Sequence, residues 1–133
     1  MATRERIAIV TGAGSGIGRT VALTLQRDGY DVVIAGRRSV ALEETAAAAN
    51  DDGGRVIPCP TDISNPDAVN ALFSTTHRSF GRLDVLFNNA GVMPPAIPME
   101  ELSIEQWQEA IDVNLTGTFL CACQAIKLMK EQY

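Results

Sequence analysis

The feature that most constrains this chain lies near its start, where a short apolar run breaks into glycines and then resumes as an apparent helix. The segment reads RIAIVTGAGSGIGRTVALTLQ. Ile7 to Val10 predicts a strand covered on both faces, because the run is continuously apolar and rich in β-branched residues. Ile17, Val21 and Leu25 then recur every four residues, which indicates a helix, and Gly29 follows as its expected end. The glycines therefore form a sharp turn between a buried strand and a helix.

A strand that turns sharply into a helix presents the helix's free N–H groups and its positive dipole end, which together form an anion site. In such a turn Gly12 permits the tight bend, Gly16 lets a pyrophosphate approach the backbone, and Gly18 lets the helix pack closely on the strand. The phosphate loop of nucleotide triphosphatases is excluded, because it requires a lysine where Arg19 stands and a glycine where Ala13 stands. The turn indicates nucleotide binding, and a purely structural strand-to-helix turn is the alternative.

The same alternation of strand and helix patterns continues along the chain. Further strands are predicted at Val32–Ala35, at Arg55–Pro58, which a proline ends, and at Leu83–Phe87. Helices are predicted after a cap at Ser39, after a capping box of Ser64 and Asp67, after a second box of Ser103 and Gln106, and over Leu115–Met129. Strands alternating with helices of this length indicate right-handed crossovers, so the fold class is α/β, with a parallel, doubly wound sheet in three α/β/α layers. No repeat, linker or charge block divides residues 1–133, which predicts a single domain.

Composition and charge limit the partners. The net charge of −5 and the pI near 4.7 give no general attraction to phosphate backbones or anionic lipids, so nucleic acid is not expected as a partner and any anion site must be local. No apolar run reaches the length of a membrane span or of a signal-peptide core, so no membrane association is expected. The three cysteines, Cys59, Cys121 and Cys123, lack the spacing of zinc ligands. We therefore predict no metal site and a cytoplasmic location.

Four short motifs, taken in order, resemble those of one enzyme family. The turn Thr11-Gly12-Ala13-Gly14-Ser15-Gly16-Ile17-Gly18 resembles the cofactor turn of the short-chain dehydrogenase/reductase family. Thr61-Asp62-Ile63 resembles the acidic turn after the third strand of that family, and Asn88-Asn89-Ala90-Gly91 resembles the signature after the fourth. Asp112-Val113-Asn114 resembles the segment that carries a catalytic asparagine. The resemblance extends to about Lys130 and implies a Rossmann-type fold that binds NAD(P).

The resemblance also implies particular cofactor contacts. In the family, the aspartate that corresponds to Asp62 contacts the adenine, and the Asn-Asn-Ala-Gly segment supports the sheet and lines the cofactor. Taken singly, Asp62 could be a helix cap, and Asn88 and Asn89 could simply close a loop. The residues that we predict to bind the cofactor are Thr11, Gly12, Ser15, Gly16, Ile17, Gly18, Arg37, Arg38, Asp62, Ile63, Asn89, Ala90, Gly91 and Val113.

The residues at the end of the second predicted strand indicate whether the cofactor is NAD(H) or NADP(H). The chain there reads Ala35-Gly36-Arg37-Arg38. A carboxylate at this place, about 20 residues beyond the glycine turn, binds the ribose of NAD, whereas the 2′-phosphate of NADP calls for an arginine. With no acid at Gly36 and a guanidinium at Arg37, we predict NADP(H) in preference to NAD(H). The alternative is a pair of solvated arginines before a helix. Ser15 stands where some NADP-preferring relatives carry a second basic residue.

The resemblance implies hydride transfer between a nicotinamide and a carbonyl or alcohol carbon. A tyrosine exchanges the proton, a lysine four residues on lowers the tyrosine's pKa, a serine orients the substrate oxygen, and an asparagine helps a water reach the lysine. Of this catalytic set only Asn114 is present, because Tyr30 is followed four residues later by Ile34, and Tyr133 ends the sequence. We therefore expect the cofactor-binding half of an NADP(H)-dependent oxidoreductase, truncated after the fourth strand and the following helices and inactive alone.

Further expectations concern the later part of the chain. Asn114 inside a helical pattern predicts a bend, because its side chain competes with the backbone for hydrogen bonds. In the family, the helix that contains Phe119 packs against another subunit, which implies a homo-oligomer. Without a fifth strand beside it, the strand at Leu83–Phe87 would be an apolar edge prone to aggregation.

The alternative function is a non-catalytic module that binds NADP(H) or joins a relative. The segment Gly91–Glu101, with its prolines, would border the substrate, whose identity the sequence does not specify.

Overall fold

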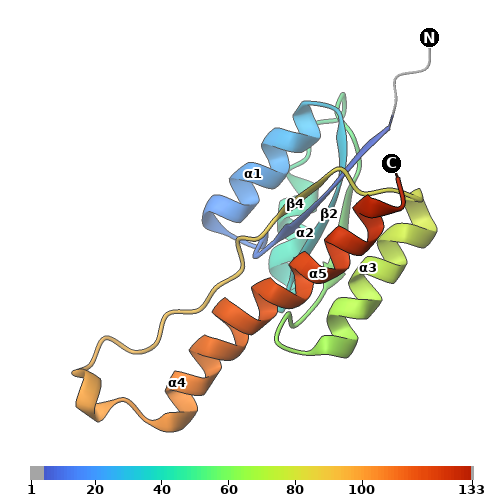
Figure 1. Cartoon of the computed structure of the whole chain (residues 1–133). Coiled ribbons are helices and arrows are strands. Elements are labelled where there is room, and N and C mark those ends of the chain that lie inside the picture. The colour runs from blue at the N-terminus through green and yellow to red at the C-terminus, as the bar shows by residue number, and fades with distance from the viewer. Residues whose placement is uncertain (1–4, 133) are drawn as a thin grey trace.

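A computed structural model describes residues 5–132, in which strands and helices alternate along the chain (Figure 1). The strands are β1 (Arg6–Thr11), β2 (Tyr30–Gly36), β3 (Val56–Pro60) and β4 (Val85–Phe87). The helices are α1 (Gly16–Arg27), α2 (Ser39–Ala47), α3 (Pro66–Phe80), α4 (Ile104–Ile111) and α5 (Thr118–Lys130). A 3₁₀ turn at Met99–Glu101 precedes α4, and a π-helical segment at Asp112–Gly117 joins α4 to α5.

The four strands form one parallel sheet in the order β3-β2-β1-β4, which confirms the predicted doubly wound topology. β1 is central and pairs with β2 from Arg6 opposite Tyr30 to Thr11 opposite Ala35. On its other side β1 pairs with β4 only from Ala8 to Val10. The strand order therefore reverses between β1 and β4, and the carboxyl ends of the strands at such a switch point are where ligands bind in sheets of this kind.

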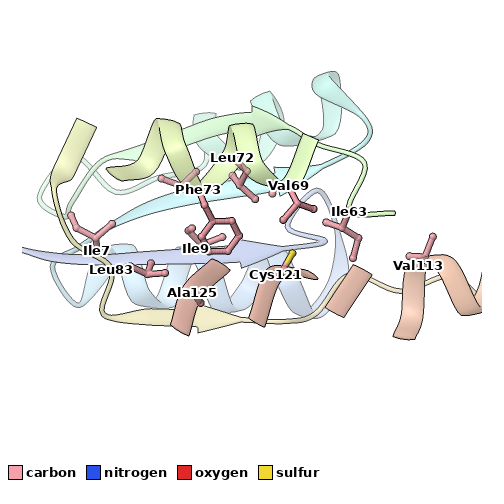
Figure 2. Packing of buried hydrophobic residues seen from close by; sticks show 12 residues of the cluster. Ile7, Ile9, Ile63, Val69, Leu72, Phe73, Leu83, Val113, Cys121 and Ala125 are labelled. Carbon is pink, nitrogen blue, oxygen red and sulfur yellow. The ribbon is translucent and has the colours of Figure 1, made fainter. Parts of the chain in front are cut away.

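The sheet is covered on both faces, which gives the expected three layers. On one face, residues of β1 and β2 such as Val10 and Ile34 pack with Ala22 of α1 and Leu42 of α2. On the other face, the core cluster joins β1 to helices α3 and α5, with Phe73 at its centre (Figure 2). Because successive side chains of a strand point to opposite faces, the continuous apolar runs of β1 and β2 supply both cores. The expectation of a buried β1 is confirmed.

Two predicted helix starts are wrong. Ser64 and Asp67 do not form a capping box, since Asn65 caps α3 and its Oδ1 accepts from the backbone N–H groups of Asp67 at 2.9 Å and Ala68 at 3.3 Å. Pro66 follows at the first helical position, where its missing N–H costs nothing. In α2, Ser39 is already helical and the N-cap is Arg38.

The other capping box is confirmed, and one strand end is corrected. Ser103 Oγ accepts from the Gln106 backbone N–H at 3.1 Å, and Gln106 Oε1 accepts from the Ser103 backbone N–H at 2.9 Å. β3 does not end at Pro58 but continues to Pro60. It lies at the edge of the sheet and pairs only with β2, and an edge strand tolerates prolines.

Within residues 5–132, no helix combines the length and the apolarity that crossing a bilayer requires. The same part of the chain holds no cluster of three or more His, Cys, Asp or Glu side chains arranged to bind a metal ion.

Candidate functional site

A cavity of about 590 Å³ opens at the carboxyl ends of the strands. Its walls come from the glycine turn after β1, the end of β2 with the start of α2, the loops after β3 and β4, and the π-helical segment. Most of the residues that we predicted to bind a cofactor meet there. They are Gly12, Ser15, Gly16, Ile17, Arg37, Arg38, Ile63, Asn89, Ala90, Gly91 and Val113.

The glycines of the turn differ in their backbone conformation and in the space that surrounds them. Gly12 has a φ of 64°, and a Cβ there would lie 2.9 Å from Ala90 Cα, so the residue lets the loop after β4 approach β1. Gly16 has a φ of 56° and no atom within 4 Å of a hypothetical Cβ, so its open side borders free space. A Cβ on Gly18 would lie 2.2 Å from the Gly12 carbonyl oxygen. Gly18 is thus needed for the packing of α1 on the turn and does not itself line the cavity.

The start of α1 leaves its backbone donors available. Ser15 is the N-cap, with an extended φ of −162°, and its side chain makes no cap hydrogen bond within the described chain. Ser15 and Gly16 are exposed and line the cavity. The first N–H groups of a helix lack intrahelical partners, and they carry the positive end of the helix dipole. This corner of the cavity is therefore suited to an anionic group such as a pyrophosphate.

Two arginines line the cavity at the end of β2. Arg37 and Arg38 are exposed, and within residues 5–132 neither guanidinium forms a hydrogen bond or ion pair. Arg37 also borders a second cavity, of about 410 Å³, together with Asp62 and Val113. A guanidinium that makes no hydrogen bond or ion pair to the protein, at the rim of a cavity, can bind a phosphate group by charge-assisted hydrogen bonds.

Asp62 lies in that second cavity, beside the first. Its Oδ1 accepts from the Ser64 hydroxyl at 2.7 Å and from the Ser64 backbone N–H at 3.0 Å. The Ser64 hydroxyl is the main cause that lowers the pKa of Asp62, and the nearby positive charge of Arg37 acts in the same direction. Asp62 therefore shapes the turn before α3 but does not cap the helix, which Asn65 does.

Thr11 and Asn89 hold the loops after β1 and β4 together. The Thr11 side chain is buried, and its Oγ1 accepts from the backbone N–H groups of Asn89 at 3.0 Å and Ala90 at 2.9 Å. Asn89 Nδ2 donates to the Gly12 carbonyl oxygen at 3.2 Å. Thr11 does not line the cavity, so its hydroxyl fixes the shape of the site rather than facing a ligand.

Both polar atoms of the Asn114 side chain form hydrogen bonds to the loop after β4. Its Oδ1 accepts from the Val92 backbone N–H at 2.7 Å, and its Nδ2 donates to the Val92 carbonyl at 2.8 Å. Asn114 does not line the cavity, and it lies in the π-helical segment, a local change of helix type; the bend expected around it stays a prediction. Of the two tyrosines, Tyr133 lies outside the described residues, while Tyr30 begins β2 with its ring 4.2 Å from the Arg6 guanidinium carbon. Tyr30 is therefore at the opposite end of the strand from the cavity.

The structure adds wall residues that sequence reasoning did not select. They are Gly14, Gly36, Ala41, Leu42, Thr61 and Val92. Most are small or apolar, and such residues carry no chemical signature until the tertiary structure places them. Sequence reasoning also missed Arg19, which donates from Nη2 to the Gly14 carbonyl oxygen at 2.6 Å. A signal for it was available, because an arginine directly after the glycine turn is within one helical turn of the turn's carbonyl groups.

Comparison with known proteins agrees with this geometry. The family model described as short chain dehydrogenase matches residues 6–133. A 3beta-hydroxysteroid dehydrogenase of Mediterraneibacter gnavus is 41% identical over 126 residues, which are 95% of this chain and 46% of that protein. The crystal structure of levodione reductase superposes with a TM-score of 0.91 at 32% identity, over 96% of this chain and 50% of that one.

A second solved structure, a metagenomic short-chain oxidoreductase in complex with NADP, has a TM-score of 0.91 at 31% identity, over 96% of this chain and 57% of that one. The chain thus spans about half the length of the relatives it matches. The sequence match shows that the chain belongs to the short-chain dehydrogenase family, and the sheet topology and the glycine turn agree with it.

Proposed function

We propose that this chain binds NADP(H) in the cavity at the carboxyl ends of its strands, as the cofactor-binding part of an oxidoreductase. One observation carries the proposal: the uncapped start of α1 and the two arginines at the end of β2 line the same cavity. The helix start suits the pyrophosphate, and Arg37 with Arg38 suits the 2′-phosphate. The NADP complex of a solved relative supports a nicotinamide dinucleotide as the ligand.

The remaining wall residues have roles consistent with this ligand. Asp62, which shares the second cavity with Arg37 and Val113, would lie toward the adenine, as the family resemblance implies. Ile63 and the segment Ala90–Gly91 line the main cavity and would contact the dinucleotide along its length. Thr11 and Gly18 support the turn from outside the cavity.

The reaction of the parent enzyme would be hydride transfer between the nicotinamide and a small carbonyl or alcohol substrate. The 133 residues contain no tyrosine followed by a lysine four positions later, so the proton donor of this reaction is missing from the sequence given. Asn114 would act as a positioning residue, through its two hydrogen bonds to Val92. We therefore expect the 133-residue chain to bind NADPH without oxidising it in the presence of ketones or aldehydes.

The assignment to NADP(H) is tested by titrating the chain with NADPH and NADH while recording nicotinamide fluorescence. A charge-assisted hydrogen bond contributes roughly 1.5 to 3 kcal/mol, so Arg37→Ala is expected to weaken NADPH binding by about 10- to 100-fold. NADH binding is expected to change little. Arg27→Ala, an exposed arginine in the last turn of α1, is the matched control. Equal losses of NADPH and NADH binding in Arg37→Ala would contradict the assignment.

A second candidate function is a module that joins another subunit. The observation that favours it is a row of exposed apolar side chains along α4, the π-helical segment and α5, including Trp107, Leu115 and Phe119.

The proposed location for either function is the cytoplasm. The free thiols of Cys59, Cys121 and Cys123 are consistent with a reducing compartment, and burial raises the pKa of the Cys121 thiol to about 11, which keeps it unreactive.

A further inference from the structure

Arg19 of α1 and Thr45 of α2 form a bridge beside the glycine turn. Arg19 Nη2 donates to the Gly14 carbonyl oxygen at 2.6 Å, and its Nε donates to Thr45 Oγ1 at 2.9 Å. The Thr45 hydroxyl in turn donates to the Ala13 carbonyl oxygen at 2.8 Å. Thr45 is fully buried, and the Arg19 side chain is about one-third exposed. The bridge therefore binds two successive carbonyl groups of the turn from the side of α2.

The bridge has further contacts with α2. Arg19 Nη2 lies 3.4 Å from the Ala41 carbonyl oxygen and 3.5 Å from Glu44 Oε2. The turn itself also touches the helix there, since a Cβ on Gly14 would lie 3.0 Å from Ala41 Cβ. These contacts fix the glycine turn against the first turns of α2. That helix begins at Ser39, directly after the two arginines of the cavity.

Carbonyl groups and N–H groups of the turn have opposite effects on an anion. A carbonyl oxygen that faced the cavity would repel a phosphate group, whereas the N–H groups at the start of α1 attract one. The carbonyl groups of Ala13 and Gly14 accept instead from Thr45 and Arg19, and neither donor residue lines the cavity. The bridge thus ties the turn to α2, the helix that directly follows the two arginines of the cavity.

We propose that the Arg19–Thr45 bridge is a positioning device that sets the spacing between the pyrophosphate turn and the 2′-phosphate arginines, and through that spacing the preference for NADP(H). The inference rests on the proposed function. NADP(H) contacts both the turn and the arginines, so its affinity depends on their separation, whereas NAD(H) has no 2′-phosphate and depends mainly on the turn. Loosening the bridge therefore weakens NADP(H) binding more than NAD(H) binding.

The test uses the full 133-residue chain and isothermal titration with NADPH and with NADH. Arg19→Met and Thr45→Val each remove the bridging groups at similar side-chain volume, while Thr45→Ser keeps the hydroxyl. Arg27→Met, on the same helix, controls for the loss of a surface arginine. We expect Arg19→Met and Thr45→Val to raise the Kd for NADPH about 10-fold and the Kd for NADH less than about 3-fold. Thr45→Ser and Arg27→Met are expected to stay near the unaltered chain.

A merely structural role gives a different pattern. Both cofactors would then lose affinity in proportion to the drop in melting temperature, and that result overturns the proposal. Arg19→Lys adds a check, because it keeps the charge but not the two-point donation, and it is expected to give an intermediate loss for NADPH. If Thr45→Val does not fold, the two Arg19 variants carry the comparison.

A double-mutant cycle separates this proposal from the proposed function. If the bridge acts by placing Arg37, then Arg19→Met adds little to the loss of NADPH affinity caused by Arg37→Ala. Fully additive losses overturn the positioning role while leaving NADP(H) binding intact. If the unaltered chain binds neither NADPH nor NADH, the proposed function fails, and the positioning role fails with it.

Discussion

At the scale of single residues, the Ser64 hydroxyl stabilises the charged form of Asp62. Its hydrogen bond to Asp62 Oδ1, helped by the Ser64 N–H and by Arg37, lowers the pKa of Asp62 in the folded chain. A lowered folded-state pKa contributes stability that is present above the unfolded value of about 3.9 and is lost as the pH falls through the folded value. We expect Ser64→Ala to raise the pKa of Asp62 and to flatten the dependence of unfolding free energy on pH below about 4.

The measurement is a carbon NMR titration of the Asp62 carboxyl group in the unaltered chain, in Ser64→Ala and in Ser64→Thr. Ser64→Thr keeps the hydroxyl and is expected to preserve the low pKa of Asp62. The idea is untenable if Asp62 titrates alike in Ser64→Ala and in the unaltered chain, because the hydroxyl would then contribute nothing to the charged form.

Single residues differ in how far the sequence predicts their place. Gly12 and Gly16 could be predicted as turn glycines, because a sharp strand-to-helix turn requires positive φ, and the structure has φ values of 64° and 56° there. Gln26 could not be predicted as a buried clamp. Its Nε2 donates to the carbonyl groups of Asn50 at 2.6 Å and Gly54 at 2.9 Å, and that pairing exists only once β3 lies beside β2. Thr45 escaped prediction for the same reason, since the groups it binds, Arg19 and the Ala13 carbonyl, lie outside its own helix.

At the scale of elements, the join between β1 and α1 tolerates substitution very unevenly. A Cβ on Gly18 would lie 2.2 Å from the Gly12 carbonyl oxygen and 2.5 Å from Asn89 Nδ2, and the backbone oxygen cannot move without opening the turn. We expect Gly18→Ala to lower the free energy of unfolding by about 3 kcal/mol, as overpacking does in tight sites. Gly16→Ala meets no atom within 4 Å and is expected to lose only about 1 kcal/mol, from its positive φ.

The substitution at Gly16 is also expected to affect the binding of NADPH. A methyl group on Gly16 would occupy the open side of the turn, where we place the pyrophosphate, so Gly16→Ala is expected to fold and to bind NADPH at least about 10-fold more weakly. Gly81→Ala is the control, because Gly81 also has a positive φ of 70° and open space around it but ends α3 away from the cavity. Urea unfolding and NADPH titration measure both quantities. Tight NADPH binding by a folded Gly16→Ala chain would place the pyrophosphate elsewhere.

Element boundaries show where local sequence signals stop being decisive. The capping box of Ser103 and Gln106 is a local motif and is present as predicted. At α3 two local motifs compete, and the combination of Asn65 with Pro66 determines the start because Ser64 is already bonded to Asp62. The extent of β3 is set by pairing with β2, which a single-strand pattern does not contain. Local chemistry predicts an element, and its neighbours decide where it ends.

At the scale of the whole molecule, the parallel, doubly wound sheet could be predicted from the alternation of elements, because short right-handed crossovers leave few arrangements. The consequence for β4 is that it lies at the edge of the sheet, and its residues Val85–Phe87 are only half-buried. The expectation that this edge promotes aggregation stays a prediction. Relatives about twice as long as this chain have further residues with which such an edge could be covered.

A row of exposed apolar side chains predicts self-association. Along α4, the π-helical segment and α5, the side chains of Ile104, Trp107, Leu115, Phe119 and Ile126 are exposed, with Phe119 at 62%. α4 also extends beyond the sheet, so part of this surface has no layer of its own chain beneath it (Figure 1). Several large apolar side chains exposed along one continuous helical stretch are typical of an interface. We expect the chain to sediment as a dimer or larger species at micromolar concentration.

The variant Phe119→Lys tests this expectation, because a charge at the centre of an apolar interface is desolvated at a cost that association does not recover. Sedimentation velocity is expected to show a shift toward monomer, with NADPH affinity unchanged, since Phe119 does not line the cavity. Val40→Lys is the control, for Val40 is equally exposed but lies on α2, in the opposite layer. If Val40→Lys dissociates the assembly as readily as Phe119→Lys, the interface lies on the other face of the sheet, and the row of side chains on α4 and α5 must be covered by something other than a second copy.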